Sequence, residues 1–350
     1  MKKFSGSVFA RYILVGLIFP FIVQYTFYYR YTPNYLTDVF SKDQFNQVYR
    51  SSVFRYRILS RELHLWLYDK LASSDKFKGA GSGKIYANRL TALDPRADET
   101  FYFTYFVLAY IFTAFMAVLL LLIFDMDLML HLDASQKIFI TTFLVLLNGF
   151  SQFCVTPYDN PGLFFNLLSI YLYLHWIRSR SALILLLFMA TIIISTTNRE
   201  SSALSLSFVA SIYISKFGLL SFRWIKPLIA PVLCFIITYA LLRILLPGHA
   251  KITEELRFYD NINIFRLSRL TGIFFTIFTF YFILNQSPVP ANKNLILNFL
   301  LAASPYILFI LAIGLWIEFR LWLPLVYPAV ILSKINIERI EAALSPVKSS

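Results

Sequence analysis

Charged residues and cysteines are scarce in this chain. Only 15% of its 350 residues are charged, whereas 58% are hydrophobic and the mean hydropathy is +0.64. A soluble domain carries about a quarter charged residues, so this composition argues against a soluble enzyme and against a disordered protein. The two cysteines, Cys154 and Cys234, are too few for a disulfide framework or a metal cluster, and we expect them to be small core residues.

Long apolar runs are present instead, together with 36 Phe and 22 Tyr. Runs of about 20 apolar residues predict transmembrane helices, because backbone groups in hydrocarbon must hydrogen-bond within their own segment. The expected fold class is all-α: a polytopic integral membrane protein with about ten transmembrane helices in a single membrane domain, residues 1–350. The spans are expected near residues 9–29, 101–124, 137–154, 162–177, 181–196, 203–220, 227–247, 270–284, 296–317 and 321–333.

The Lys and Arg residues of the short connections predict the orientation of the chain in the membrane. If the N-terminus is cytoplasmic, the inner connections hold more than twice as many Lys and Arg residues as the short outer connections. Such an excess is typical of cytoplasmic loops. Residues 30–100 are then a long first extracytoplasmic loop, residues 334–350 are a short cytoplasmic tail, and both termini are cytoplasmic. The formal net charge of +13 reflects this bias and implies no nucleic acid.

The middle of the first loop has apolar residues at helical spacing. Leu59, Leu63, Trp66 and Leu67 would share one face of a helix over residues 58–68. A helix with such a face lies along a membrane interface, so we expect amphipathic helices within this loop.

Polar residues recur at the outer ends of the predicted spans. Ionisable groups in such positions are costly to bury, so several of them on one face of the membrane predict a functional site. Taken one group at a time, helix-end charges that face water or pair locally are the favoured interpretation, and it is the four groups together that make a shared site a comparable one. The groups are Asp38, Asp43, Arg50, Arg55 and Arg57; Tyr158, Asp159 and Asn160; Asn198, Arg199 and Glu200; and Glu318, Phe319 and Arg320.

The arginines in these groups favour a phosphate ligand. Arg55 and Arg57 can point to one side of an extended segment, and guanidinium forks match phosphate oxygens bidentately. Asp43 can act as a general base toward an acceptor hydroxyl, or can hold a divalent cation together with phosphate oxygens. The four histidines are widely separated and form no i, i+4 pair, so no zinc site is expected.

Several of these strings together resemble a known family. They are residues 43–49 (DQFNQVY), 54–59 (FRYRIL), 158–165 (YDNPGLFF), 178–180 (RSR), 197–200 (TNRE) and 318–324 (EFRLWLP). Their order and spacing, over most of the membrane region, resemble the polytopic GT-C glycosyltransferases and above all the mannosyltransferase-like group. Many members carry more acidic residues in the first loop and a large soluble C-terminal domain, so the resemblance is to a minimal, diverged or catalytically silent member.

The resemblance implies transfer of a sugar from a polyprenyl-phosphate-linked donor to a lipid or surface-glycan acceptor, on the extracytoplasmic face of a bacterial plasma membrane. It implies Asp43 as the catalytic base or metal-associated carboxylate. The substrate-binding residues that it implies are Asp38, Arg55, Arg57, Asp159, Arg199, Glu200, Glu318 and Arg320.

Two other functions remain open. A polysaccharide polymerase or ligase also uses outer arginines, for a lipid pyrophosphate, but with a large late outer loop for which residues 247–269 are the one candidate. A non-enzymatic lipid or glycan transporter, or an assembly subunit, is the other. Transporters tend to carry broken helices and polar groups at the bilayer midplane, and such groups are few here.

Overall fold

The computed structural model describes residues 6–30, 40–51, 53–74, 97–152, 154–246, 261 and 270–344. Within these residues every regular element is a helix, and the only β pairing is an isolated antiparallel bridge between Met129 and Ile335. The prediction of an all-α fold is thereby confirmed.

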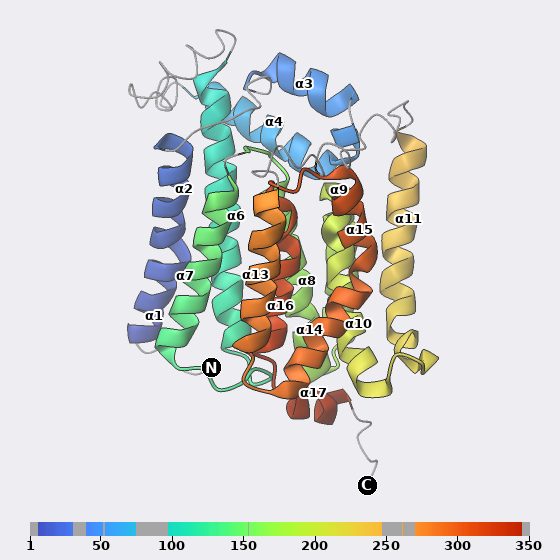
Figure 1. Cartoon of the computed structure of the whole chain (residues 1–350). Coiled ribbons are helices and arrows are strands. Elements are labelled where there is room, and N and C mark those ends of the chain that lie inside the picture. Colours follow the sequence, from blue (N-terminus) through green and yellow to red (C-terminus); the bar gives the residue numbers. More distant parts are fainter. Residues whose placement is uncertain are drawn as a thin grey trace.

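The helices form an upright bundle whose two ends differ (Figure 1). One end, called the α4 end below, is covered by α3 (Lys42–Ser51) and α4 (Ile58–Ala72); the opposite α17 end carries α17 (Ile337–Leu344). The other helices are α1 (Gly6–Ile13), α2 (Phe19–Tyr29), α6 (Glu99–Phe124), α7 (Ala134–Ser151), α8 (Asp159–Ser179), α9 (Ala182–Asn198), α10 (Ala203–Phe217), α11 (Ile229–Leu245), α13 (Thr271–Asn285), α14 (Pro290–Ala302), α15 (Ser304–Ile313) and α16 (Leu323–Ser333).

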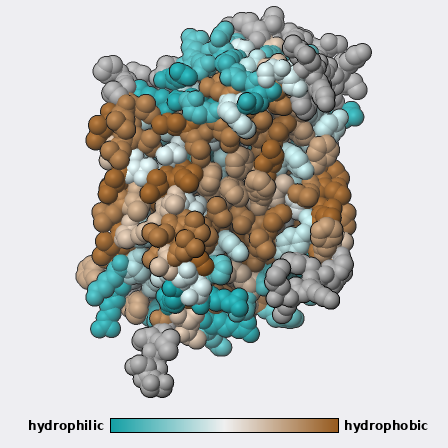
Figure 2. Space-filling view, turned by 180° about the vertical axis from the view of Figure 1, so that it is seen from behind, coloured by the Kyte–Doolittle hydropathy of each residue, from teal (hydrophilic) through white to brown (hydrophobic). Residues whose placement is uncertain are grey.

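Each predicted apolar range is helical, with α1 and α2 in residues 9–29 and α14 and α15 in residues 296–317, but few of the helical segments meet the length and apolarity of a span. Within the described ranges, three helical segments do so: Val8–Tyr29, Glu99–Phe124 and Phe222–Leu245. A fourth is added if α14 and α15, bent by 54° at their junction, form one span. The number is below the ten expected, and three of the remaining helices, α9, α13 and α16, are apolar but only 10–17 residues long. On the face seen in Figure 2, a broad hydrophobic band separates two hydrophilic ends.

The bend between α14 and α15 has a cause in the sequence. Pro305 stands in the first turn of α15, and a proline there lacks the N–H that would continue the helix from α14. The predicted span over residues 296–317 is therefore two short helices rather than one long one.

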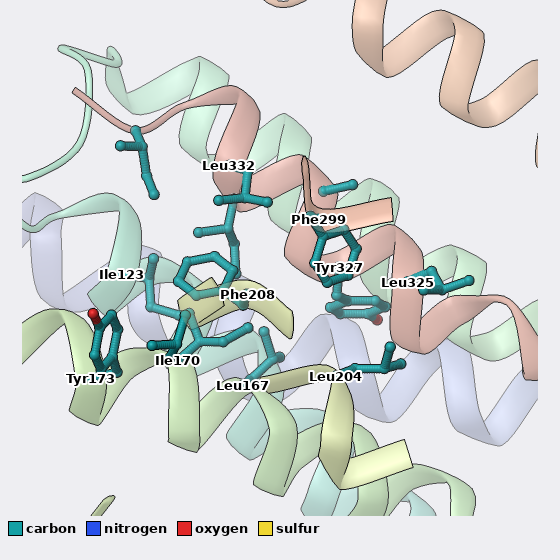
Figure 3. Close-up of a cluster of buried hydrophobic side chains, with 14 of the residues drawn as sticks. Ile123, Leu167, Ile170, Tyr173, Leu204, Phe208, Phe299, Leu325, Tyr327 and Leu332 are labelled. Carbon is teal, nitrogen blue, oxygen red and sulfur yellow. The ribbon is translucent and has the colours of Figure 1, made fainter. Parts of the chain in front are cut away.

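The core lies where α8, α10, α14 and α16 meet (Figure 3). Phe208 of α10, Phe299 of α14 and Tyr327 of α16 are almost completely buried there, beside Leu167 of α8. The Tyr327 hydroxyl donates to a backbone oxygen of α7, Leu144 O, at 2.8 Å. Because lipid is as apolar as these side chains, close packing and interhelical hydrogen bonds of this kind hold such a bundle together.

A chain of buried polar side chains ties α8 to its neighbours. Gln24 Nε2 of α2 donates to Thr113 Oγ1 of α6 at 2.9 Å. Asn148 Nδ2 of α7 donates to the same Thr113 oxygen at 3.0 Å and to Asn160 Oδ1 of α8 at 2.7 Å. These bonds locate the first turn of α8, which begins at Asp159, and so position the site described next.

The predicted amphipathic helix is present as α4, which lies across the end of the bundle rather than along it (Figure 1). Its buried side chains are those of Ser60, Arg61, His64 and Leu65. Trp66, from the predicted apolar face, is 57% exposed. Leu59, Leu63 and Leu67 of the same face are half-buried, so this face is only partly open.

Candidate functional site

Four buried charged side chains meet at the α4 end, and we call them the Asp159 cluster: Asp159, Glu318, Arg199 and Arg320. Asp159 accepts hydrogen bonds from the Arg199 guanidinium and from Arg320, whose Nη1 is 2.8 Å from Asp159 Oδ2. Glu318 Oε2 accepts from Arg320 Nη2 at 2.9 Å and from Arg320 Nε at 3.2 Å. All four side chains are less than 10% exposed.

Three separate connections of the chain supply this cluster. Asp159 begins α8, Arg199 stands between α9 and α10, and Arg320 lies in the 3-10 turn Phe319–Leu321 before α16. Thr156 Oγ1 adds a hydrogen bond to Asp159 Oδ2 at 2.7 Å. A carboxylate in the first turn of a helix is also stabilised by the helix dipole.

The Asp159 cluster is balanced in charge, with two guanidinium groups and two carboxylates. A buried charge is tolerated only when it is paired and hydrogen-bonded, and each of these groups is. The cluster therefore braces three connections of the bundle, and its arginines are already engaged by protein carboxylates.

A second group of side chains lies beside it, and we call it the Glu200 rim; two of its members are buried and the other three are partly exposed. It consists of Arg55 and Tyr56 before α4, Arg57, Glu200 after α9, and Arg243 of α11. Glu200 is approached from two sides, with Arg57 Nη2 3.7 Å from Oε2 and Arg243 Nη2 3.9 Å from Oε1. The Arg243 guanidinium also covers the Tyr56 ring at 3.7 Å from its centroid.

The Glu200 rim carries an excess of positive charge, because it holds three arginines and one carboxylate, and two of the arginines, Arg57 and Arg243, face Glu200. The side chains of Glu200 and Arg243 are 33% and 40% exposed. The two ion-pair distances exceed the 2.7–3.2 Å of a good N–H···O hydrogen bond. These contacts can therefore be exchanged for the oxygens of an anionic ligand at little cost.

The surrounding charges set the ionisation of the rim. Burial raises the pKa of Glu200, and the positive charges of Arg57, Arg199 and Arg243 lower it. The lowering is larger than the rise, so the pKa lies below its ordinary value. Burial likewise raises the pKa of the Tyr56 hydroxyl, which hydrogen bonds from Arg55 and Arg243 bring below its ordinary value. Arg55 Nη2 is 2.5 Å from this hydroxyl oxygen. Glu200 is therefore an anion at neutral pH.

The structure brings most of the predicted site residues together. Asp159, Arg199, Glu318 and Arg320 form one contact set, and Arg55, Arg57 and Glu200 belong to the adjoining rim. Tyr158 joins the two sets, since the Arg57 and Arg199 guanidinium groups lie 3.8 and 5.6 Å from its ring centroid.

Asp43 lies elsewhere. It is exposed in the first turn of α3, and within the described ranges no hydrogen bond or ion pair joins it to either set. Its charge acts on Tyr68 of α4. Tyr68 is eleven residues along that helix from Arg57, or roughly 16 Å. Asp38 is outside the described residues. The role of Asp43 as a base thus stays a prediction with no described contact behind it.

Two residues of the site were not singled out from the sequence: Arg243 and Tyr56. Arg243 had a signal that could have found it, because a lone arginine near the end of an apolar helix is costly and marks a functional position by default. Tyr56 had none, since tyrosines at helix ends are common in an aromatic belt.

A divalent cation does not fit the described carboxylates. No group of three or more His, Cys, Asp or Glu side chains in the described part of the chain is arranged to hold a metal ion. Asp159 and Glu318 both bind Arg320, and Glu200 faces two arginines. Comparison of the chain with protein-family models, curated proteins and solved structures gives no match.

Proposed function

We propose that this protein is a membrane glycosyltransferase that takes a sugar from a polyprenyl-phosphate-linked donor and passes it to a lipid or surface-glycan acceptor. The Glu200 rim carries the proposal. It offers Arg57 and Arg243 in loose ion pairs and in positive excess, with Arg243 40% exposed and Arg57 15% exposed, beside an apolar helix face. Guanidinium groups in such a setting suit a phosphate with two or more free oxygens.

An apolar hollow next to the rim supports a lipid-linked donor. It has a volume of about 420 Å³ between α4 and the end of α9. It is lined by Ile58, Leu59, Glu62, Leu63, Trp66 and Thr197. Ile58 follows Arg57 directly and Thr197 precedes Glu200 by three residues. A phosphate held by the rim would therefore have room beside it for the first units of an isoprenoid chain.

We also propose how the helices are oriented in the membrane. The ten helical segments that match the predicted ranges cross the plasma membrane of a bacterium, with both termini in the cytoplasm and the α4 end outside. The three segments of full span length support this, as does the hydrophobic band of Figure 2. A donor carried by a polyprenyl lipid would reach the α4 end by diffusion within the outer leaflet.

The chemistry is a single displacement with inversion. The oxygen of an acceptor hydroxyl attacks the anomeric carbon, the bond from that carbon to the phosphate oxygen breaks, and polyprenyl phosphate leaves with the electron pair. Arg57 and Arg243 stabilise the charge that develops on the phosphate. The acceptor proton goes to a carboxylate, for which Asp43 is the candidate from the family resemblance and Glu200 is the candidate from the geometry of the rim.

The test is transfer by the full chain in proteoliposomes, with radiolabelled polyprenyl-phosphate-mannose and then with other hexoses as the sugar. Arg57→Gln and Arg243→Gln are each expected to lower kcat/KM at least tenfold. Arg50→Gln is the matched control, because Arg50 is exposed on α3 and donates to Asn46 of the same helix at 3.0 Å. No transfer with any such donor, or transfer unaltered in both rim variants, would overturn the proposal.

The bend between α14 and α15 favours one alternative, a lipid or glycan transporter, because discontinuous helices recur in transporters. Movement of a fluorescent polyprenyl-linked glycan across vesicles, with no sugar transferred, would support that function. The polymerase interpretation depends on residues 247–269, of which the structure describes Asn261 alone. Long products rather than single additions would favour it.

A further inference from the structure

A long apolar groove runs along the outside of the bundle between α7 and α13, with α16 at its floor. Its volume is about 890 Å³. Phenylalanines form both walls and remain 43–69% exposed, while floor residues such as Leu144 and Val326 are fully buried. The wall residues are Phe139, Phe143 and Phe150 of α7 and Phe275, Phe278 and Phe282 of α13.

One end of the groove carries a charge. Lys334, directly after α16, is the only charged residue among the described residues of its lining, and Gln136 of α7 stands at the same end. Within the described ranges no hydrogen bond or ion pair engages the Lys334 ammonium. Burial holds the pKa of this ammonium below its usual value, as expected of a cation without a counter-ion.

The backbone around Lys334 is held firmly. Its carbonyl oxygen accepts a hydrogen bond from Leu130 N at 2.8 Å, next to the bridge between Met129 and Ile335. Asn292 Nδ2 of α14 donates to Ser333 O at 3.0 Å and to Ile335 O at 2.9 Å. Three parts of the chain therefore fix the lysine at the mouth of the groove.

We infer that this groove binds an anionic glycerophospholipid of the leaflet at the α17 end, with its acyl chains along the phenylalanine walls and its phosphate at Lys334. A cation at the end of a groove between membrane helices is the pattern that recognises an anionic headgroup. The apolar walls supply the contact that an acyl chain needs. The lipid would therefore occupy a specific site rather than the non-specific layer of lipid around the protein.

The two ends of the groove distinguish this ligand from the proposed donor. At the α4 end the lining is uncharged, with Thr271, Gly272, Ile317 and Phe319. Arg320, next in the chain, turns to Asp159 instead. A phosphate in this groove would therefore be recognised at the end opposite the Glu200 rim, and the inference does not depend on the proposed function. A second copy of the chain fits less well, because close helix pairing favours small residues over phenylalanine walls.

The experiment measures binding of spin-labelled phosphatidylglycerol and phosphatidylcholine to the purified full chain in mild detergent. The wild type is expected to prefer phosphatidylglycerol, and Lys334→Gln is expected to reduce that preference about fivefold, the factor for one basic residue near a lipid surface. Lys226→Gln, at an exposed lysine near the same end, is the control and leaves the preference unchanged. Thr279→Trp, in the lining, is expected to reduce the binding of both lipids.

Size-exclusion chromatography confirms that each variant is folded before binding is compared. Equal binding of the two lipids to the wild type, or an unchanged preference in Lys334→Gln, would overturn the inference. So would displacement of the labelled lipid by an equal amount of polyprenyl phosphate, which would assign the groove to the donor. A dimer that Thr279→Trp dissociates would assign the groove to a second copy and would overturn it as well.

Discussion

Arg57 lies against the ring of Tyr158, with its guanidinium carbon 3.8 Å from the ring centroid. The arginine precedes α4 and the tyrosine precedes α8, so this contact fastens the helix layer at the α4 end to the bundle below it. Tyr158 also faces Arg199 at 5.6 Å. The ring therefore contacts one arginine of the rim and one of the buried cluster, and so couples the two.

Replacing Tyr158 by leucine is expected to loosen the rim. The ring attracts Arg57 by a cation–π interaction worth about 0.5–2 kcal/mol, which leucine cannot supply. We expect Tyr158→Leu to raise KM for the donor several-fold, and Tyr158→Phe, which keeps the ring, to behave like the wild type. Steady-state transfer in proteoliposomes measures this. Equal losses in the two variants would mean that the ring face is not what positions Arg57.

Removing the charge of Asp159 is expected to destabilise the whole protein. Asp159→Asn leaves Arg199 and Arg320 with less counter-charge in a buried site, and breaking a buried pair costs about 3–5 kcal/mol. The measurement is thermal unfolding in detergent, where we expect a clearly lower Tm. Asp43→Asn is the matched control because Asp43 is exposed, and its Tm should stay within error of the wild type. An unaltered Tm in Asp159→Asn would show that the cluster does not brace the connections.

The proton acceptor can be identified by comparing two carboxylate variants. If a carboxylate acts as general base, removing it costs about 10²–10⁴-fold in rate. We expect one of Glu200→Gln and Asp43→Asn to lose kcat by this factor while the donor still binds. Loss in Asp43→Asn alone would require α3 to move toward the rim during the reaction. Full activity in both variants would contradict general-base catalysis by either residue.

Buried His64 is expected to make stability depend on pH. Its ring packs among Phe45, Phe101 and Tyr105, and neither ring nitrogen has a hydrogen-bond partner among the residues that the structure describes. Burial lowers its pKa from 6.5 to about 3. The contribution to stability is complete above the unfolded pKa of 6.5 and falls as the pH drops toward the folded value, because only the unfolded state then takes up the proton.

Between pH 6.5 and pH 5 this single group is expected to remove about 2 kcal/mol of stability. Chemical unfolding at several pH values measures the slope, and His64→Phe, which keeps the stacked ring, should reduce it. The same slope in the wild type and in His64→Phe would mean that His64 is not the group responsible.

The helical class and the positions of the helices were within reach of the sequence. Apolar runs must form helices in hydrocarbon, so each predicted range is helical, and polar residues were expected at the ends where Asp159, Arg199 and Arg320 stand. The break before α15 was readable from Pro305 in the same way, although one long span was predicted there. These features are local, and local backbone physics determines them.

Tertiary structure alone decided which charges neutralise one another. Asp159 pairs with Arg199, 40 residues away, and with Arg320, 161 residues away, which leaves Arg57 and Arg243 to the exposed rim. It also separated Asp43 from that rim. Helices that are apolar on every side can pack in many orders, so the sequence of each one carries little information about its neighbours, and only the assembled bundle determines which helix ends meet.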